Sequence, residues 1–152
     1  MKRLGTLMLA VAIGCAGFAC YAFAEDRKLV LVTSARTEPV TLTQAEIRQL
    51  FLGHAVTKDN LQITAVINKS DPLLYEVFLQ KVVFMSAYSY ERQLVSKVFR
   101  SGGQRPPTVT SLDQLGRELD KRPGTVTFMW KENTRKLPNV TVVNDLWHGS
   151  ID

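Results

Sequence analysis

The sequence predicts an α/β domain with a mostly parallel sheet flanked by helices, preceded by a segment for export. Short apolar runs rich in β-branched residues are typical of strands that are buried on both faces. Other segments repeat apolar residues three and four positions apart behind a capping residue, which is typical of helices. Because the two kinds of segment alternate along the chain, strands joined by crossover helices are the expected arrangement.

Residues 1–24 have the layout of a secretory signal peptide. Lys2 and Arg3 form a positively charged start, and a long uncharged stretch follows, ending in the small-residue site Ala22-Phe23-Ala24. The sequence therefore predicts cleavage after Ala24 and one domain over residues 25–152, located in the periplasm. A retained membrane anchor is the alternative, although the stretch is at the short end of the roughly 20 residues that span a bilayer.

Both cysteines, Cys15 and Cys20, lie in the export segment, so a cleaved product contains neither of them. The domain would then have no disulfide and no thiolate for catalysis or metal binding. Processing as a lipoprotein is an alternative, in which the chain is cut before Cys15 and lipid is attached there. Cleavage after residue 24 also lowers the formal net charge from +5 to +3, and no basic-aromatic motif indicates nucleic-acid binding.

The first predicted strand covers residues 28–33, with the sequence KLVLVT, and a helix follows it. This helix begins with the capping box Thr43-Gln44-Ala45-Glu46 and ends at Gly53. A second strand is predicted over residues 62–67. The next helix, over residues 72–83, has Asp71 as its N-cap and a proline at its favoured first position.

Ser86 caps a third helix, predicted over residues 87–99, and a polar loop with two arginines and two glycines follows it up to Arg105. This loop could wrap an anion or contact a partner, whereas a solvated helix end is the simpler interpretation. Aromatic residues at helical or strand spacing are interpreted as core residues, namely Tyr88, Tyr90, Phe99, Phe128 and Trp130. Trp147 could either dock the tail on the body or contact a partner.

A fourth helix is predicted from Ser111 to Asp120, and the turn Arg122-Pro123-Gly124 closes it. Two more strands are predicted, one over residues 125–130 and one over residues 140–143. No internal repeat and no low-complexity linker interrupts this order of elements, so one domain is expected.

Four segments in this order resemble the phosphate-type periplasmic substrate-binding proteins, and specifically one lobe of them. They are residues 42–53 (LTQAEIRQLFLG), the strand-to-helix segment 68–78, the loop 101–107 and the segment 122–129 (RPGTVTFM). The resemblance implies a periplasmic-binding-protein-like fold, phosphate or a similar oxyanion as the ligand, and a membrane transporter of the ABC type as a partner.

Residues 68–74, with the sequence NKSDPLL, depart from the family pattern, which typically has an arginine and a Gly-Ser-Gly-Thr turn here. Pro72 contributes no N–H, and no glycine lets the backbone approach an anion closely. Thr127 likewise replaces a glycine of the last segment. Specific sites bury about 70–90% of the ligand surface, so a single lobe implies weak binding unless a homodimer or another partner covers the ligand.

The candidate anion-binding residues are Ser34 and Thr37 after the first strand, and Lys69 and Ser70 after the second. Hydroxyl groups donate hydrogen bonds to phosphate oxygens, and Lys69 supplies positive charge. Helix N-termini after these strands would add N–H groups that also favour anions. The competing interpretation is that the first pair orders a turn and that Ser70 helps to cap a helix.

No motif for catalysis, a metal or a cofactor occurs, and His54 and His148 each lack a second ligand at helical spacing. The sequence therefore favours an exported, non-enzymatic solute-binding-like protein with weak affinity for phosphate or another oxyanion. The alternative is a ligand-free interaction or sensory module of a bacterial envelope system, which would work with a receptor or transporter. An exported enzyme has the least support.

Overall fold

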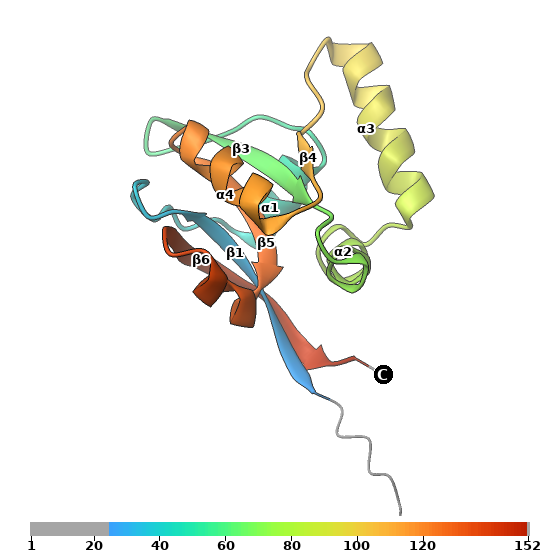
Figure 1. Ribbon diagram of the computed structural model, residues 1–152. Coiled ribbons are helices and arrows are strands. Elements are labelled where there is room, and N and C mark those ends of the chain that lie inside the picture. Colours follow the sequence, from blue (N-terminus) through green and yellow to red (C-terminus); the bar gives the residue numbers. More distant parts are fainter. Residues whose placement is uncertain (1–24, 152) are drawn as a thin grey trace, which may run out of the picture.

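The computed structural model describes residues 25–151, so the predicted signal peptide and its two cysteines lie outside the described residues. Figure 1 shows a twisted sheet with α4 on one face and α1 on the other, while α3 stands at one side of the molecule. No helix in this part of the chain has the length and apolar character needed to cross a membrane.

The sheet has the strand order β2-β3-β5-β1-β6, and the short strand β4 pairs with the end of β3. The strands are β1 (Asp26–Ser34), β2 (Val56–Lys58), β3 (Leu61–Asn68), β4 (Thr108–Val109), β5 (Thr125–Trp130) and β6 (Val140–Ser150). The helices are α1 (Gln44–Phe51), α2 (Pro72–Phe78), the π-helical turn η1 (Leu79–Val83), α3 (Ala87–Ser101), α4 (Leu112–Lys121) and the 3₁₀ helix η2 (Lys131–Lys136).

The sheet is mixed rather than mostly parallel, which corrects the sequence prediction. β3 is parallel to β4 and β5, but β1 runs antiparallel to both of its neighbours, β5 and β6, and β2 runs antiparallel to β3. The prediction assumed that every strand returns in the same direction through a helix. The first strand instead lies between two strands from the end of the chain, and local sequence patterns carry no information about such pairs.

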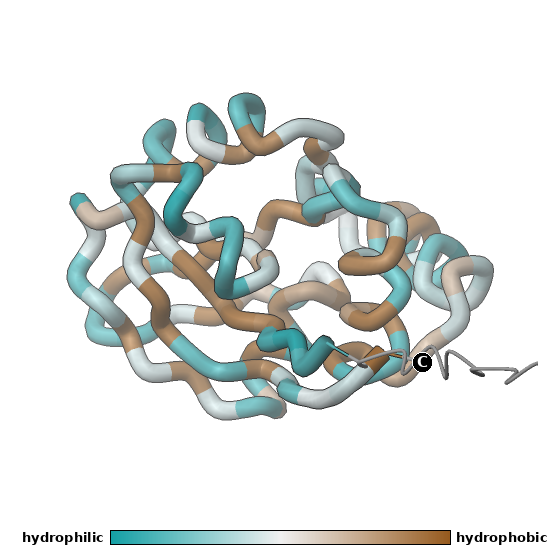
Figure 2. Tube along the Cα trace, turned by 60° about the horizontal axis from the view of Figure 1, so that its bottom comes forward, coloured by the Kyte–Doolittle hydropathy of each residue, from teal (hydrophilic) through white to brown (hydrophobic). Residues whose placement is uncertain are grey.

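Both faces of the sheet are buried, as the continuous apolar run of the first strand predicted. On one face, Leu29 and Leu31 pack with the residues of α1, α2 and η1. On the other face, Val30 and Val32 pack against α4. Figure 2 shows the same distribution, with apolar residues along the strands and hydrophilic residues in many of the surrounding turns.

The predicted N-caps are confirmed at the four α-helices. Thr43 and Glu46 form a capping box, and Asp71, Ser86 and Ser111 each accept hydrogen bonds from backbone N–H groups of the helix that follows. These bonds satisfy donors that a helix leaves unpaired in its first turn. The prediction missed β2 and β4, because strands of two or three residues are too short to show a period.

Two aromatic residues that the sequence places in the core are exposed instead. Tyr90, Phe128 and Trp130 are buried as predicted, but Tyr88 and Phe99 have 71% and 85% of their surface exposed. The helical spacing of α3 is real, but its buried residues are confined to the face that carries Tyr90 and Leu94.

Trp147 docks the tail on the body, which resolves one open alternative. Its half-buried ring packs against the main core cluster, and the Nζ atom of Lys81 lies 6.0 Å from the ring centroid. β6 accordingly extends well beyond the strand predicted over residues 140–143.

Tyr90→Phe is expected to lower the free energy of unfolding by about 1–3 kcal/mol, because it leaves a buried carbonyl without its donor. The Tyr90 hydroxyl donates to the backbone oxygen of Phe51 at 2.7 Å in a buried environment. Urea denaturation at equilibrium measures the loss. Tyr88→Phe is the matched control, since Tyr88 is exposed, and equal effects of the two substitutions would contradict the assignment.

Candidate functional site

The structure places the two predicted residue pairs at opposite ends of the sheet. Thr33, near the end of β1, pairs with Val126 near the start of β5, because the two strands are antiparallel. β3 runs parallel to β5, so Lys69 and Ser70, which follow β3, lie near the end of β5. Ser34 and Thr37 therefore do not share a site with Lys69 and Ser70.

Ser34 and Thr37 are buried and make hydrogen bonds within the fold. The Ser34 hydroxyl donates to Asp120 Oδ1 at 2.8 Å, and the Thr37 hydroxyl oxygen accepts from the N–H of Gly124 at 3.4 Å. A Cβ atom at Gly124 would lie 2.6 Å from the backbone oxygen of Gln62, so this turn needs a glycine. The geometry supports the interpretation that this pair orders the turn.

Lys69 belongs to a charged cluster with Glu91 and Arg105, beside the ring of Tyr75. One carboxylate oxygen of Glu91 lies 3.2 Å from Lys69 Nζ, and the other binds the Arg105 guanidinium. The Lys69 ammonium also lies 4.6 Å from the centroid of the Tyr75 ring. The residues of the cluster come from the end of β3, from α2, from α3 and from the loop after α3. The cluster contains two positively charged side chains and one carboxylate.

The Tyr75 hydroxyl is buried and has no hydrogen-bond partner among the described residues, which is uncommon for a buried polar group. Burial raises the pKa of Tyr75, although the nearby Lys69 opposes this effect, so the hydroxyl stays protonated at neutral pH. Desolvation alone would raise the pKa of Glu91, but hydrogen bonds from Lys69 and Arg105 lower it below its usual value. Glu91 is therefore charged at neutral pH.

The side chain of Asp71 occupies the N-terminus of α2. Its Oδ1 atom accepts from the N–H groups of Leu73 at 2.9 Å and Leu74 at 3.3 Å, and its Oδ2 atom accepts from Trp130 Nε1 at 2.9 Å. In the family that the sequence resembles, amides at this position are expected to bind the anion. In this chain the carboxylate of Asp71 accepts the hydrogen bonds of those amides. The N–H of Ser70 donates to Asn68 Oδ1 at 3.0 Å.

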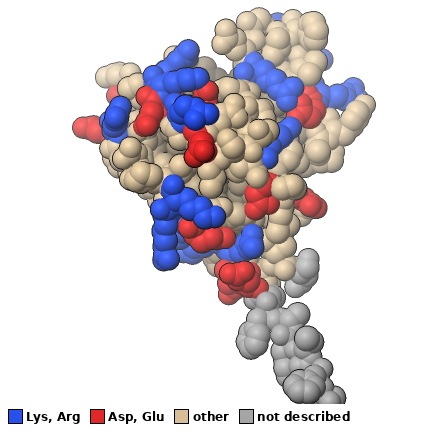
Figure 3. Space-filling model, viewed as in Figure 1, with Lys and Arg blue, Asp and Glu red and all other residues tan. Residues whose placement is uncertain are grey.

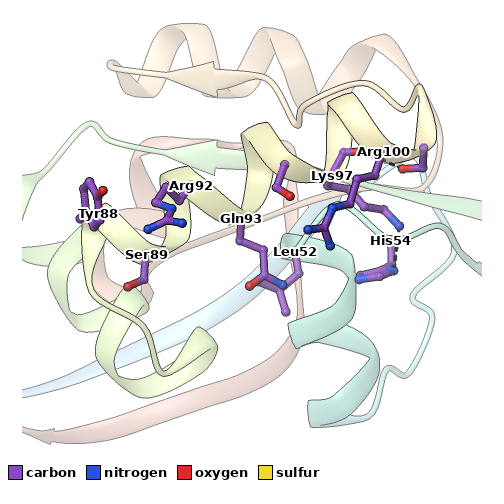
Figure 4. Close-up of a pocket in the computed structure, with 10 residues that line it drawn as sticks. Leu52, His54, Tyr88, Ser89, Arg92, Gln93, Lys97 and Arg100 are labelled. Atoms are coloured by element: carbon purple, nitrogen blue, oxygen red, sulfur yellow. Dashed lines mark hydrogen bonds between the residues drawn. The ribbon is translucent and has the colours of Figure 1, made fainter.

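A groove of about 640 Å³ runs between α3 and the turn that follows α1 (Figure 4). Arg92, Lys97 and Arg100 line it from α3, and Leu52 and His54 line it from the turn, while no aspartate or glutamate lines it. Lys97 Nζ lies 3.2 Å from His54 Nδ1. Sequence reasoning missed this groove because its two walls come from segments about 40 residues apart, and only the α3 wall shows a helical period.

The two histidines differ in exposure. His54 is half-buried in the groove, and His148 is exposed on β6. Between residues 25 and 151, no three His, Cys, Asp or Glu side chains come close enough together to hold a metal ion.

No protein-family model matches the sequence, and no curated protein resembles it at a significant level. The structure, however, is similar in fold to several solved structures. PstS from Borrelia burgdorferi is 12% identical, with a TM-score of 0.53 over 80% of this chain and 49% of that chain. A possible phosphate binding protein from Planctomyces limnophilus DSM 3776 is also 12% identical, with a TM-score of 0.50 over 79% of this chain and 42% of that chain.

This chain therefore spans about half the length of the structures it matches. It shares the fold of about half of each of these structures, which agrees with the predicted α/β lobe with helices flanking a sheet, although the sheet is mixed rather than mostly parallel. At this level of identity the similarity establishes the fold, and the site must be argued from the side chains.

Asp71→Ala is expected to lower the free energy of unfolding by about 2–4 kcal/mol, since it removes a helix cap and leaves the buried Trp130 indole N–H unpaired. Equilibrium urea denaturation checks this value. Asp71→Asn is the matched control, because its amide oxygen still caps α2, and it should lose less than half as much. A loss below about 0.5 kcal/mol for Asp71→Ala would contradict the structural role of this carboxylate.

Proposed function

We propose that the protein is an exported, non-enzymatic solute-binding-like domain that binds phosphate or another small oxyanion weakly. The proposed site is the cluster of Lys69, Tyr75, Glu91 and Arg105, with Ser70 beside it. One observation carries the proposal: two cationic side chains share a single carboxylate next to a buried tyrosine hydroxyl that has no hydrogen-bond partner among residues 25–151. An oxyanion would replace Glu91 on both cations and accept the hydrogen bond that Tyr75 can donate.

The exposure of the cluster favours a low affinity. About a third of each charged side chain is in contact with water, with exposed fractions of 32% for Lys69, 35% for Glu91 and 38% for Arg105. Ion pairs at such sites are worth about 0–1 kcal/mol, so the displacement of Glu91 would cost little. Water would weaken the new contacts in the same way, and one lobe covers only one side of the ligand.

Export into the periplasm through a cleaved signal peptide is part of this proposal. A periplasmic lobe would have a membrane transporter or a receptor as its partner. A homodimer would be another way to supply the missing wall of the site. The similarity in fold to PstS and to the possible phosphate binding protein supports this class of role.

A second candidate function is a ligand-free interaction or sensory module of the cell envelope. The position of Asp71 favours it, because this carboxylate already satisfies the first amides of α2. A lobe with its own carboxylate at this position does not need a bound anion to complete the fold. Titration with oxyanions separates the two candidates.

Phosphate or sulfate is expected to raise the melting temperature of the protein by several degrees near saturation. A ligand at 100 times its dissociation constant stabilises a protein by about 2.7 kcal/mol, and a domain of this size shifts by several degrees per few kcal/mol. A thermal-shift titration against chloride at matched ionic strength measures the effect. Lys69→Ala and Tyr75→Phe should reduce the shift in melting temperature. Lys131→Ala is the control and should not reduce it, because Lys131 is an exposed lysine on η2. No shift at tens of millimolar phosphate would favour the second candidate.

Glu91→Gln is expected to tighten sulfate and phosphate binding by about threefold to tenfold, because it removes the negative charge that competes with the anion. The same thermal-shift titration, fitted for the dissociation constant, measures the change. Glu76→Gln serves as the matched control, since Glu76 is exposed on α2. Weaker binding by Glu91→Gln would show that Glu91 organises the site rather than competes for it.

A further inference from the structure

Most of the exposed large apolar side chains of the described residues lie on or next to α3. Of five such residues, four are in this region, and their exposed fractions are 70% for Phe84, 71% for Tyr88, 44% for Val95 and 85% for Phe99. Tyr88, Arg92, Val95 and Phe99 follow each other at intervals of four, three and four residues, so they share one helical face. We call these four residues the α3 row, and it lies on the opposite face from the buried Tyr90 and Leu94.

Phe84 precedes α3 and is the C-cap residue of the π-helical turn η1. Its φ angle is 56°, in the left-handed region that bulky side chains rarely adopt. Its side chain is mostly exposed, so burial of the ring does not compensate for this backbone conformation. A left-handed residue commonly ends a helix, and the N–H of Phe84 donates to the backbone oxygen of Leu79 in η1. Phe84 therefore adds an exposed ring two residues from the cap of α3.

The groove beside the α3 row carries positive charge without a matching negative charge. Arg92, Lys97 and Arg100 line it (Figure 4), and none of them forms an ion pair with any residue that the structure describes. Glu91 is the one acidic residue of α3, and it is bound to Lys69 and Arg105 instead. Figure 3 shows that on the visible face most acidic side chains lie beside basic ones.

We propose that the α3 row and the adjoining groove bind an acidic amphipathic helix of a partner protein. The apolar face of that helix would cover Tyr88, Val95 and Phe99, and its carboxylates would pair with the three cations of the groove. Recognition of an amphipathic helix by a groove with an apolar wall is a recurring mode of binding. The positive charge selects an acidic partner and speeds its association.

Charge and shape favour this occupant over two others. A second copy of the chain docked through α3 would place Arg92 and Arg100 of both copies near each other, and such like charges oppose association. A flat anionic membrane could contact the α3 row, but it could not enter the groove between α3 and the turn at Leu52 and His54, where Lys97 lies. An acidic protein segment satisfies both parts of the surface.

Site-specific photo-crosslinking of the full chain in cells of its own organism tests the proposal. A photoreactive phenylalanine analogue such as p-benzoyl-phenylalanine replaces Phe99 or Tyr88, and mass spectrometry maps the crosslinked segment. The expected product joins both positions to one protein segment that is rich in Asp and Glu and has apolar residues at helical spacing. The same analogue in place of Val142, exposed on β6, should not give this product.

Charge variants make the test specific. Arg92→Glu combined with Arg100→Glu is expected to reduce crosslinking from position 99 at least tenfold, and Arg92→Gln combined with Arg100→Gln is a milder pair in case the first is unstable. Lys136→Glu is the matched control, because this exposed lysine on η2 is outside the groove, and it should leave the yield unchanged. Thermal melting confirms that each variant is folded.

Four results would overturn the proposal: a crosslink to a second copy of the chain, a crosslink to lipid, the absence of any crosslink, and a yield that does not depend on the two arginines. The proposal does not rest on oxyanion binding, since neither Lys69 nor Arg105 lines the groove. The charge variants should therefore keep the response to phosphate of the unaltered protein, so that the two proposals can fail separately.

Discussion

The pairing of β1 with β5 and β6 is the constraint on which the rest of the structure depends. It places the first described strand inside the sheet, between two strands from the end of the chain. Because the side chains of β1 alternate between the two faces, this strand contributes to both core clusters. Its antiparallel direction also sends the turn after β1 to one end of the sheet and the turn after β3 to the other.

Local features of this fold could be predicted because local forces determine them. The capping residues Thr43, Asp71 and Ser86 accept hydrogen bonds from donors two or three positions away, so the pattern is visible in a short stretch of sequence. The apolar run of β1 likewise indicates burial on both faces. Each of these patterns involves neighbours in the chain, and the structure confirms them.

The direction of β1 and the composition of the candidate site depend on contacts between distant residues. Lys69 and Ser70 were recognised by their position after a strand, and Arg105 as part of a loop that could bind an anion. Glu91 and Tyr75 were not recognised, since only the fold brings them to Lys69 and Arg105. The role of Asp71 was recognised in part, because a cap is a local feature and its bond to Trp130 is not. Tyr88 and Phe99 were interpreted as core residues from their helical spacing, but a helical period does not indicate which face of the helix is covered.

The central position of β1 also has a consequence for how the chain folds. β1 pairs only with β5 and β6, so it has no strand partner until residue 125 and those beyond it are available. A chain that is synthesised or threaded through a membrane from its N-terminus must therefore keep an apolar strand unpaired for most of that time. Unpaired strands of this kind aggregate readily, and long-range pairs form slowly. A holdase chaperone that binds residues 29–32 until the last strand emerges would protect this chain from aggregation during folding.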